Sequence, residues 1–375
     1  MRSNRRRVRQ TLWPQVIAAM LMLGVVAAVG FAVGKRAQPQ VVKSHAVVHI
    51  KTKPATEATL DLQKYLPKNQ FSGVAALYRN GKRVATLAQG QATAQTLNTP
   101  DNLFEIDSVQ KSVTAGLVMH EAMQGKLHLR DHLSQYFPQV PGSDTITIRQ
   151  LLDMASGLTV QGGFLSKDYI NDQTTVDRML AKLRYTPAMN GQGRYQAADY
   201  VVLVGILMKL THQSYQTLVE NEYIKPLHLT HTRFAYDRNM AEVALGHSLG
   251  KHGLTDETPV NATSAQQHQE LGTGQLLMSV DDLFAVESGL LSGRLLGGNN
   301  VSALLFAPGS LSTYGGGLYQ NGPFRSANGF GYGYECFLRI TQSGRDAVIV
   351  MSNCSVPKAA NEVAADKIAL AWLTH

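Results

Sequence analysis

Two serines in the sequence have neighbours that could make them nucleophiles. Ser108 lies in "FEIDSVQKSV", three residues before Lys111, and Ser248 lies in "GHSLG", between Gly246 and Gly250. A serine hydroxyl is a weak nucleophile until a base takes its proton. Residues i and i+3 share one helix face, so Lys111 can reach Ser108 if this stretch is helical. Gly-x-Ser-x-Gly is instead the pattern of a strand–turn–helix nucleophile elbow.

The sequence around Ser248 does not favour an elbow. Glycines at 250 and 253 and the polar residues after them are typical of a loop or hairpin, whereas an elbow needs a helix after the serine. The chain has 33 glycines, so the pattern also arises by chance. An α/β-hydrolase would also need an acid and a histidine downstream, and no context favours the histidines present, which are His252, His268 and His375. We therefore expect Ser248 to be structural.

Ser108 has surroundings better suited to a nucleophile. The run "SVTAGLVMHEAMQGKL" has apolar residues at helical spacing, which places Ser108 at the start of a helix. Burial in an apolar helix favours the neutral form of Lys111, which a base requires. A helix N-terminus also directs backbone N–H groups toward a developing oxyanion. Alone, Ser-x-x-Lys also matches an ordinary helix start with a surface lysine.

The elements that would position Ser108 change type along the chain. "FSGVAALYRNGKRVATLAQG" predicts a hairpin around Asn80-Gly81. The middle is mostly helical: "ITIRQLLDMASGL" predicts a short helix ending at Gly157, residues 198–224 a buried helix and a second one, and residues 270–296 a helix capped by Ser279 or Asp281. The last third returns to strands, "GYGYECFLRI" and "DAVIVMSN", and closes with a helix.

This order predicts an α/β (α+β) fold. A mixed, antiparallel-rich sheet flanked by helices would be formed from both chain ends, with an all-helical lobe inserted between them.

Several segments together resemble the serine β-lactamase-related proteins of the class C type, over roughly residues 60–373. They are "FEIDSVQKSV" with "ITIRQLLDMASGL", "RYQAADYVVL", "GTGQLLMSVDDL" and "ANGFGYGYECFL". This family includes penicillin-binding proteins, D-alanyl-D-alanine carboxypeptidases and related esterases. The resemblance implies an α/β domain with an all-helical lobe, and a catalytic site between the two.

The first two site motifs of the family carry over unequally. The first is intact and implies that Ser108 is the acylated nucleophile and Lys111 its base. The second, Tyr-x-Asn in the family, reads "YQA" here. Tyr195 inherits a share of the proton transfer, and Ala197 replaces an asparagine that helps to hold the substrate and position the lysine.

The third motif, Lys-Thr-Gly or His-x-Gly in the family, aligns with "ANG", Ala327 to Gly329. Gly329 would let the substrate approach the backbone, but the basic residue that often recognises a substrate carboxylate is missing. A lost charge-assisted hydrogen bond costs about 1.5–3 kcal/mol. We hypothesise that Arg325, on the same strand face as Ala327, replaces the cation, whereas Asn328 points the other way. The implied oxyanion hole consists of the backbone N–H groups of Ser108 and Phe330.

These motifs favour an ester or amide hydrolase with altered specificity, acting through an acyl-enzyme on cell-wall peptide or D-alanyl ester substrates. The alternative is a weak or inactive family member that works as a binding or regulatory protein of the cell envelope. Residues 159–194, the least family-like stretch, could act as a lid. No cofactor or metal is expected, since no His/Cys cluster has zinc-ligand spacing. Nothing in the sequence predicts an oligomeric state.

The positive charge of the chain is concentrated at its N-terminus. The net charge is +8, but residues 1–36 hold seven basic residues and no acid, and the remainder has 28 basic and 27 acidic residues. Nucleic-acid binding is therefore not expected. Residues 11–34 are uncharged and about long enough to span a bilayer. We predict a cytoplasmic tail (1–10), a transmembrane anchor (11–34), a linker (35–59) and an extracellular hydrolase domain (60–375), with a cleaved signal peptide as the alternative.

The chain has two cysteines, Cys336 and Cys354, in two apolar runs separated by the turn-like "TQSGRD". Export would permit a disulfide between them. Two buried thiols fit the sequence equally well.

Overall fold

The computed structural model describes residues 62–66, 71–162, 168–237, 241–250, 253–260, 262–305, 313–320, 322–356 and 360–374. The predicted basic tail, anchor and linker lie outside these residues. Among the helices that are described, none combines the length and the apolar character that a bilayer crossing needs.

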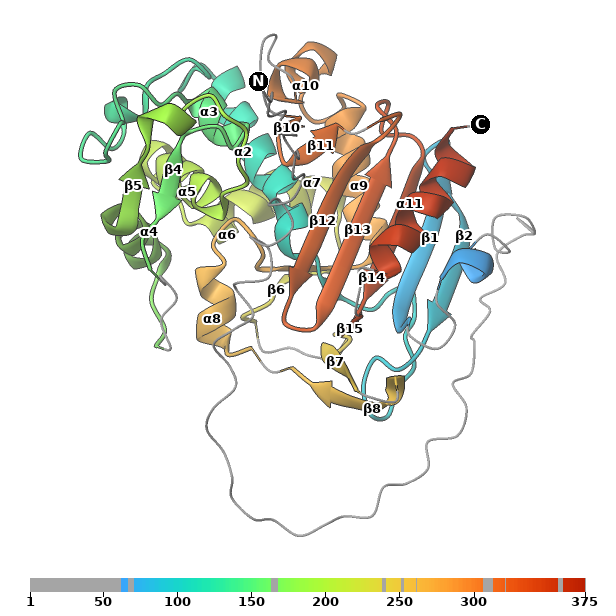
Figure 1. The fold of residues 1–375 in the computed structure, drawn as a ribbon. Coiled ribbons are helices and arrows are strands. Elements are labelled where there is room, and N and C mark those ends of the chain that lie inside the picture. Colours follow the sequence, from blue (N-terminus) through green and yellow to red (C-terminus); the bar gives the residue numbers. More distant parts are fainter. Residues whose placement is uncertain are drawn as a thin grey trace, which may run out of the picture. The chain divides into compact units, whose positions relative to one another are not determined.

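A seven-stranded sheet in the order β10-β11-β12-β13-β14-β1-β2 forms the centre of the fold (Figure 1). Its strands are β1 (Gly73–Arg79), β2 (Lys82–Gln89), β10 (Tyr314–Gly315), β11 (Leu318–Gln320), β12 (Arg325–Gly331), β13 (Tyr334–Ile340) and β14 (Ala347–Ser352). β1 pairs with β14, so both chain ends build the sheet, as predicted. Every pair is antiparallel, so the expectation of a mixed sheet was wrong. Tight hairpins join most neighbours, and these connections enforce antiparallel pairing.

Helices cover the sheet and form the inserted lobe. They are α2 (Lys111–Met123), α3 (Ile148–Leu152), α4 (Asp172–Lys182), α5 (Ala197–Thr211), α6 (Tyr215–Val219), α7 (Lys225–Leu227), α8 (Ser264–Gln269), α9 (Val280–Leu291), α10 (Gly298–Leu305) and α11 (Ala360–Leu373). Short strands complete the fold: β3 (Phe104–Glu105), β4 (Leu158–Val160), β5 (Leu183–Tyr185), β6 (Thr232–Phe234), β7 (His247–Gly250), β8 (Gly253–Pro259), β9 (Leu276–Met278) and β15 (Cys354–Ser355).

Local signals account for several boundaries of these elements. Asn80 and Gly81 both have positive φ, 53° and 79°, as a tight hairpin turn between β1 and β2 requires. Ser279 caps α9, because its side chain accepts a hydrogen bond from the backbone N–H of Asp282. The helix α3 is shorter than predicted. It ends at Leu152 rather than at Gly157, and a left-handed residue, Met154 (φ 50°), follows soon after.

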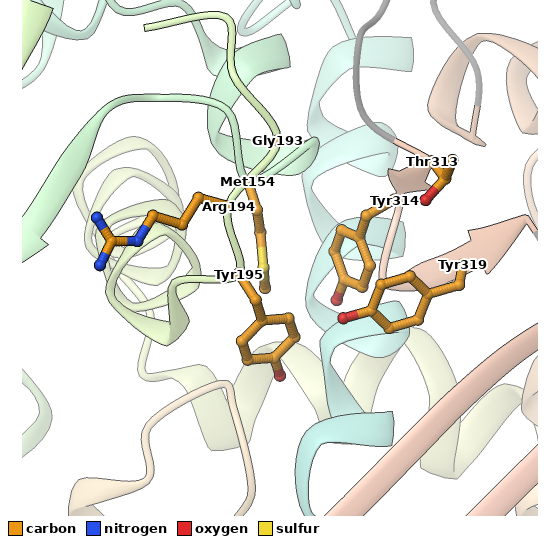
Figure 2. Close-up of a pocket in the computed structure, with 7 residues that line it drawn as sticks. All are labelled: Met154, Gly193, Arg194, Tyr195, Thr313, Tyr314 and Tyr319. Atoms are coloured by element: carbon orange, nitrogen blue, oxygen red, sulfur yellow. The ribbon is translucent and has the colours of Figure 1, made fainter. Parts of the chain in front are cut away.

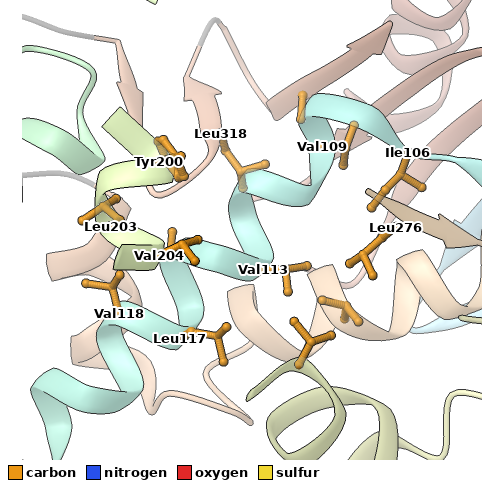
Figure 3. Packing of buried hydrophobic residues seen from close by; sticks show 14 of the residues in the cluster. Ile106, Val109, Val113, Leu117, Val118, Tyr200, Leu203, Val204, Leu276 and Leu318 are labelled. Carbon is orange, nitrogen blue, oxygen red and sulfur yellow. The ribbon is translucent and has the colours of Figure 1, made fainter. Parts of the chain in front are cut away.

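The two faces of the sheet pack against different helices. On one face, α11 lies along β13 and β14 (Figure 1) and closes a smaller core that includes Phe71, Phe337 and Ile368. On the other face, the main core joins the sheet to α2, α5 and α9. Figure 3 shows α2 within this core, where Val113 and Val118 are surrounded by apolar side chains from other elements. A helix buried on nearly every side gives the residues at its start a rigid support.

The stretch "GHSLG" is not a nucleophile elbow. Ser248 lies on β7, which pairs with β8 and with β15, and no helix follows it in the described part of this stretch. A Cβ added to Gly246 would lie 2.2 Å from the carbonyl oxygen of Tyr332, so the glycine permits a close backbone contact with the turn between β12 and β13. The expectation of a structural Ser248 agrees with this placement.

Both cysteines are described and buried, and no disulfide joins them. Cys336 lies on β13 and Cys354 on β15. Burial raises the pKa of the Cys336 thiol well above its usual value, so this group stays protonated and unreactive near neutral pH.

Candidate active site

Ser108 and Lys111 lie in direct contact at the start of α2. Ser108 belongs to a turn of 3₁₀-helix, Asp107–Gln110, that runs without a break into α2. The Nζ atom of Lys111 is 2.9 Å from the Oγ atom of Ser108 and donates a second hydrogen bond, of 3.3 Å, to the backbone oxygen of Thr273. The Lys111 side chain is 1% exposed. The lysine is therefore buried and aimed at the serine hydroxyl.

The turn that carries Ser108 is tied to the strand β9. The backbone N–H of Ile106 donates to the oxygen of Leu276 (3.0 Å), and the side-chain oxygen of Gln110 accepts from the N–H groups of Gln275 (2.6 Å) and Leu276 (2.9 Å). Asp107, directly before the serine, has φ of 46°, which is uncommon for a residue other than glycine. Such a strained conformation persists only where contacts with the surrounding structure hold the backbone in place, and it is common at functional sites.

Tyr195 lies beside this pair and presents its ring. The Nζ atom of Lys111 is 5.2 Å from the centre of the Tyr195 ring, and the tyrosine is 45% exposed. In the described structure its hydroxyl makes no hydrogen bond to Ser108 or Lys111. Catalytic hydrogen bonds are often long or unformed before substrate binds, so this geometry is compatible with a role in proton transfer. Ala197 is the first residue of α5, two residues further on.

The third motif lies on β12, and its residues alternate between the two faces of the sheet. Ala327 is buried in the main core. The Asn328 amide donates to Glu362 of α11 (2.6 Å) and its oxygen accepts from Arg339 (2.7 Å), so its side chain lies on the α11 side. Arg325 is 7% exposed, and burial lowers the pKa of its guanidinium to about 10. The substrate roles of Ala327, Asn328 and Arg325 stay predictions.

Two glycines of β12 allow this strand to pass directly beside the turn that carries Ser108. A Cβ on Gly329 would lie 2.2 Å from the backbone oxygen of Ile106, and one on Gly331 would lie 2.2 Å from a carboxylate oxygen of Asp107. Glycine at 329 is therefore required by the protein's own packing, a reason that the sequence did not reveal. Phe330 lies between these contacts, so its backbone runs beside the nucleophile's turn, where the predicted oxyanion hole would form.

Three carboxyl groups around the turn that carries Ser108 were missed from the sequence. They are the buried Glu105 and Asp107 and the half-buried Glu270. Loss of contact with water is the main cause that raises the pKa of each, and repulsion from neighbouring acids adds to the effect for Glu105 and Asp107. Lys111 acts in the opposite direction on Asp107 and Glu270. The two acids of "EIDS" were visible, but the burial of Asp107 and its approach to Glu270, which is distant in sequence, were not.

We expect Glu105→Gln to change how stability depends on pH. Burial raises the pKa of Glu105 to about 8, from an ordinary value near 4.5. Between these pH values the folded chain keeps a proton that the unfolded chain releases, so this group makes the protein less stable as pH rises. Glutamine does not titrate and can still accept the hydrogen bond from Gln267. The melting temperature of the variant relative to the natural chain should therefore rise from pH 5 to pH 8, and a constant difference would contradict this.

A pocket of about 180 Å³ opens next to Tyr195 (Figure 2). Its lining comes from the segment before α5, from the turn that follows α3, and from β10, β11 and the residue before β10: Met154, Gly193, Arg194, Tyr195, Thr313, Tyr314 and Tyr319. The segment 159–194, which stays a predicted lid, includes the last two residues of β4 and all of α4 and β5, and its last two residues, Gly193 and Arg194, line this pocket. No group of three histidine, cysteine or acidic side chains in the described ranges could hold a metal ion.

Comparison with known proteins identifies the family of this chain. The family model described as "Beta-lactamase" matches residues 55–372. The chain belongs to the β-lactamase family of serine hydrolases. Its fold is the α/β fold of β-lactamases and transpeptidases, an antiparallel sheet with helices.

Two curated members of the β-lactamase family illustrate its range. A Bacillus subtilis protein, provisionally named penicillin-binding protein PbpX, is 29% identical over 300 residues, which cover 78% of this chain and 73% of that protein. The teichoic acid D-alanine hydrolase of Staphylococcus aureus is 31% identical over 229 residues. That match covers 59% of this chain and 55% of the hydrolase, so it spans about half of the relative's length.

Two solved structures share the β-lactamase-family fold of this chain. FmtA from Staphylococcus aureus superimposes with a TM-score of 0.75 at 24% identity, over 88% of this chain and 91% of FmtA. The D-amino acid amidase from Ochrobactrum anthropi SV3 superimposes with a TM-score of 0.69 at 20% identity, over 84% of this chain and 98% of the amidase.

Proposed function

We propose that this β-lactamase-family protein is a membrane-anchored, extracellular hydrolase that forms an acyl-enzyme on Ser108 and acts on D-alanyl esters of cell-wall polymers. The observation that carries the proposal is the contact of 2.9 Å between Ser108 Oγ and the Nζ atom of the buried Lys111. A base in hydrogen-bond contact with a serine hydroxyl is the arrangement that activates this nucleophile.

The proposed reaction has two steps. Ser108 Oγ attacks the carbonyl carbon of the ester while its proton passes to Lys111 Nζ. Backbone N–H groups of Ser108 and Phe330 stabilise the negative charge on the carbonyl oxygen. The C–O bond to the alcohol then breaks, and Tyr195, together with the lysine, returns a proton to the departing oxygen. A water molecule next attacks the D-alanyl–Ser108 ester and releases D-alanine, and Ser108 recovers its proton.

The altered third motif supports an ester as the substrate. A peptide that ends in D-alanine carries a free carboxylate, which family members recognise with the basic residue that Ala327 replaces here. A D-alanyl ester of a polymer has no free carboxylate next to the bond that breaks. The likeness to a teichoic acid D-alanine hydrolase supports the same substrate class. Cell-wall peptides are the second substrate class that the site would admit.

The proposed location depends on the N-terminal sequence. Residues 11–34 are uncharged and follow an arginine-rich tail, a pattern that keeps the N-terminus in the cytoplasm and exports the rest of the chain. An outward-facing hydrolase held at the membrane would lie close to D-alanylated polymers of the envelope.

Release of D-alanine from two purified substrates tests this function. The protein should release D-alanine from D-alanylated teichoic acid faster than from a peptide that ends in D-alanyl-D-alanine, and Ser108→Ala should lose the first activity. Faster release from the peptide would point to a carboxypeptidase and contradict the proposed substrate. No release from either substrate at any pH would contradict the proposal as a whole.

The alternative is a binding or regulatory protein of the cell envelope with little chemistry of its own. Two observations favour it: Tyr195 directs its ring rather than its hydroxyl at Lys111, and Ala197 and Ala327 replace polar site residues. A gene copy encoding Ser108→Ala distinguishes the two functions. It should fail to complement a deletion strain if the protein is an enzyme, and should complement fully if the protein acts by binding.

A further inference from the structure

Three fully buried polar side chains form a chain of hydrogen bonds at the start of α2. They are Gln110, directly before the helix, Thr114, one turn further along, and Tyr215 of α6. Gln110 Nε2 donates to the Tyr215 hydroxyl (3.2 Å), which is 2.7 Å from the Thr114 hydroxyl. The Thr114 hydroxyl donates to the backbone oxygen of Gly272 (2.7 Å). The chain therefore ends on the residue directly before Thr273.

The direction of each hydrogen bond in this chain follows from its ends. The side-chain oxygen of Gln110 accepts from two backbone N–H groups at and just before the start of β9, so its amide nitrogen faces Tyr215. The one hydroxyl proton of Thr114 goes to Gly272, because a carbonyl oxygen can only accept. Tyr215 therefore donates to Thr114. Burial raises the pKa of Tyr215 to about 12, so its hydroxyl keeps the proton that this bond needs.

The chain holds the backbone on both sides of Thr273. Gln110 binds the N–H groups two and three positions after Thr273, and Thr114 binds the residue before it. Between these two attachments, the backbone oxygen of Thr273 accepts the hydrogen bond of 3.3 Å from Lys111 Nζ. A fully satisfied buried network favours a single arrangement of the elements it joins, because breaking one bond leaves a buried polar group without a partner.

The carbonyl of Thr273 orients the amine of Lys111. A lysine that acts as a base is a neutral amine, with two N–H groups and one lone pair. The hydrogen bond to Thr273 occupies one N–H group and so restricts rotation of the amine about its last C–N bond. The lone pair can then face Ser108 Oγ, which is 2.9 Å away. Proton transfer requires this alignment.

We propose that Tyr215 is a positioning residue for the general base. Its hydroxyl links two side chains that hold the carbonyl of Thr273, and this carbonyl aims the lone pair of Lys111 at Ser108. Tyr215 is fully buried and does not contact the substrate. The inference rests on the proposed function, in which Lys111 is the base, and adds a residue that none of the three sequence motifs contains.

Tyr215→Phe tests this role, because it removes one oxygen atom and little volume. We expect kcat for D-alanylated teichoic acid to fall about ten- to a hundredfold, since a small displacement of a catalytic group costs up to about two decades. KM should not change. Tyr223→Phe is the matched control: it removes a buried hydroxyl that donates to the backbone oxygen of Val113 on α2 (3.0 Å) but lies outside the chain. It should keep the natural kcat, and equal losses in both variants would overturn the inference.

Variants of Thr114 test whether the chain acts as a unit, and they do so even if Tyr215→Phe does not fold. Thr114→Ser keeps the hydroxyl and should keep the natural kcat, whereas Thr114→Val loses the bond to Gly272 and should be slow. Adding Tyr215→Phe to Thr114→Val should cause little further loss, because both changes break the same chain. Losses that multiply in the double variant would contradict the proposed chain.

Hydrogen exchange separates this inference from the proposed function. Amide hydrogens in the peptide 271–276 should exchange faster in Tyr215→Phe than in the natural chain or in Tyr223→Phe, because Gln110 holds two of them less firmly. If the natural chain neither hydrolyses the ester nor reacts with a fluorophosphonate, the proposed function fails, and exchange still decides whether the chain holds Thr273. Unchanged exchange, or faster exchange with a natural kcat, would overturn the inference.

Discussion

Replacing Ser108 with alanine should lower kcat for D-alanyl ester hydrolysis at least about a thousandfold and abolish labelling by a fluorophosphonate. No other atom at this position can form the acyl-enzyme, and removal of a catalytic nucleophile commonly costs several decades in rate. The fold should persist because Ser108 is only half-buried and its side chain contacts the end of Lys111. Steady-state kinetics and a thermal melt of the same preparation measure both effects.

Ser248→Ala is the matched control for this variant. Ser248 is an exposed serine on β7, in the stretch whose pattern resembles a nucleophile elbow. We expect its replacement to leave kcat and labelling unchanged. Loss of activity in Ser248→Ala with retention in Ser108→Ala would reverse the assignment of the nucleophile.

Lys111→Met is expected to reduce the rate of acylation by a factor of about 10² to 10⁴, the range that general-base catalysis supplies. Methionine approximates the buried aliphatic part of the lysine, so the packing of α2 should survive. The variant loses the contacts of Nζ with Ser108 and with the oxygen of Thr273. The rate at which a fluorophosphonate labels Ser108 reports how fast the serine attacks. A thermal melt confirms folding.

Lys111→Arg tests why the lysine matters. Arginine keeps a positive charge but does not lose its proton in proteins, so it cannot act as a base. If Lys111 is the base, this variant should be as slow as Lys111→Met. Retention of more than about a tenth of the natural acylation rate in Lys111→Arg would show that the site needs the charge of Lys111 and not its basicity.

Features set by neighbouring residues could be predicted from the sequence. The hairpin turn at Asn80-Gly81 depends on residues that tolerate positive φ, and the cap at Ser279 depends on one side chain and a backbone N–H three residues on. The approach of Lys111 to Ser108 is equally local, because i and i+3 share a face. These features need no information from distant parts of the chain.

Features made by distant contacts could not be predicted. The carbonyl of Thr273 reaches Lys111 from 162 positions away in the sequence, and nothing in the local pattern signals it. The same is true of Glu270, which lies near Asp107, and of Tyr319, which lies opposite Tyr195 in the pocket. Such neighbours follow from how the lobe and the β10–β11 strands come together, and a single sequence does not specify that arrangement.

The orientation of Tyr195 shows where a resemblance stops being informative. Its motif predicts a residue beside the serine and lysine, and the structure has it there. The motif does not predict that the ring, rather than the hydroxyl, faces Lys111. Ala197 lacks the amide that the resemblance implies at this position, so we expect contacts with the substrate to set the final orientation of Tyr195.

The most direct test of the central claim is to find the residue that becomes covalently modified. The protein would be treated with a fluorophosphonate, its intact mass measured, and the modified peptide sequenced by tandem mass spectrometry. We predict one adduct per chain, on the peptide that contains Ser108, and none in Lys111→Met on the same timescale. An adduct on the peptide that contains Ser248, or no adduct on a folded and concentrated protein, would contradict the account.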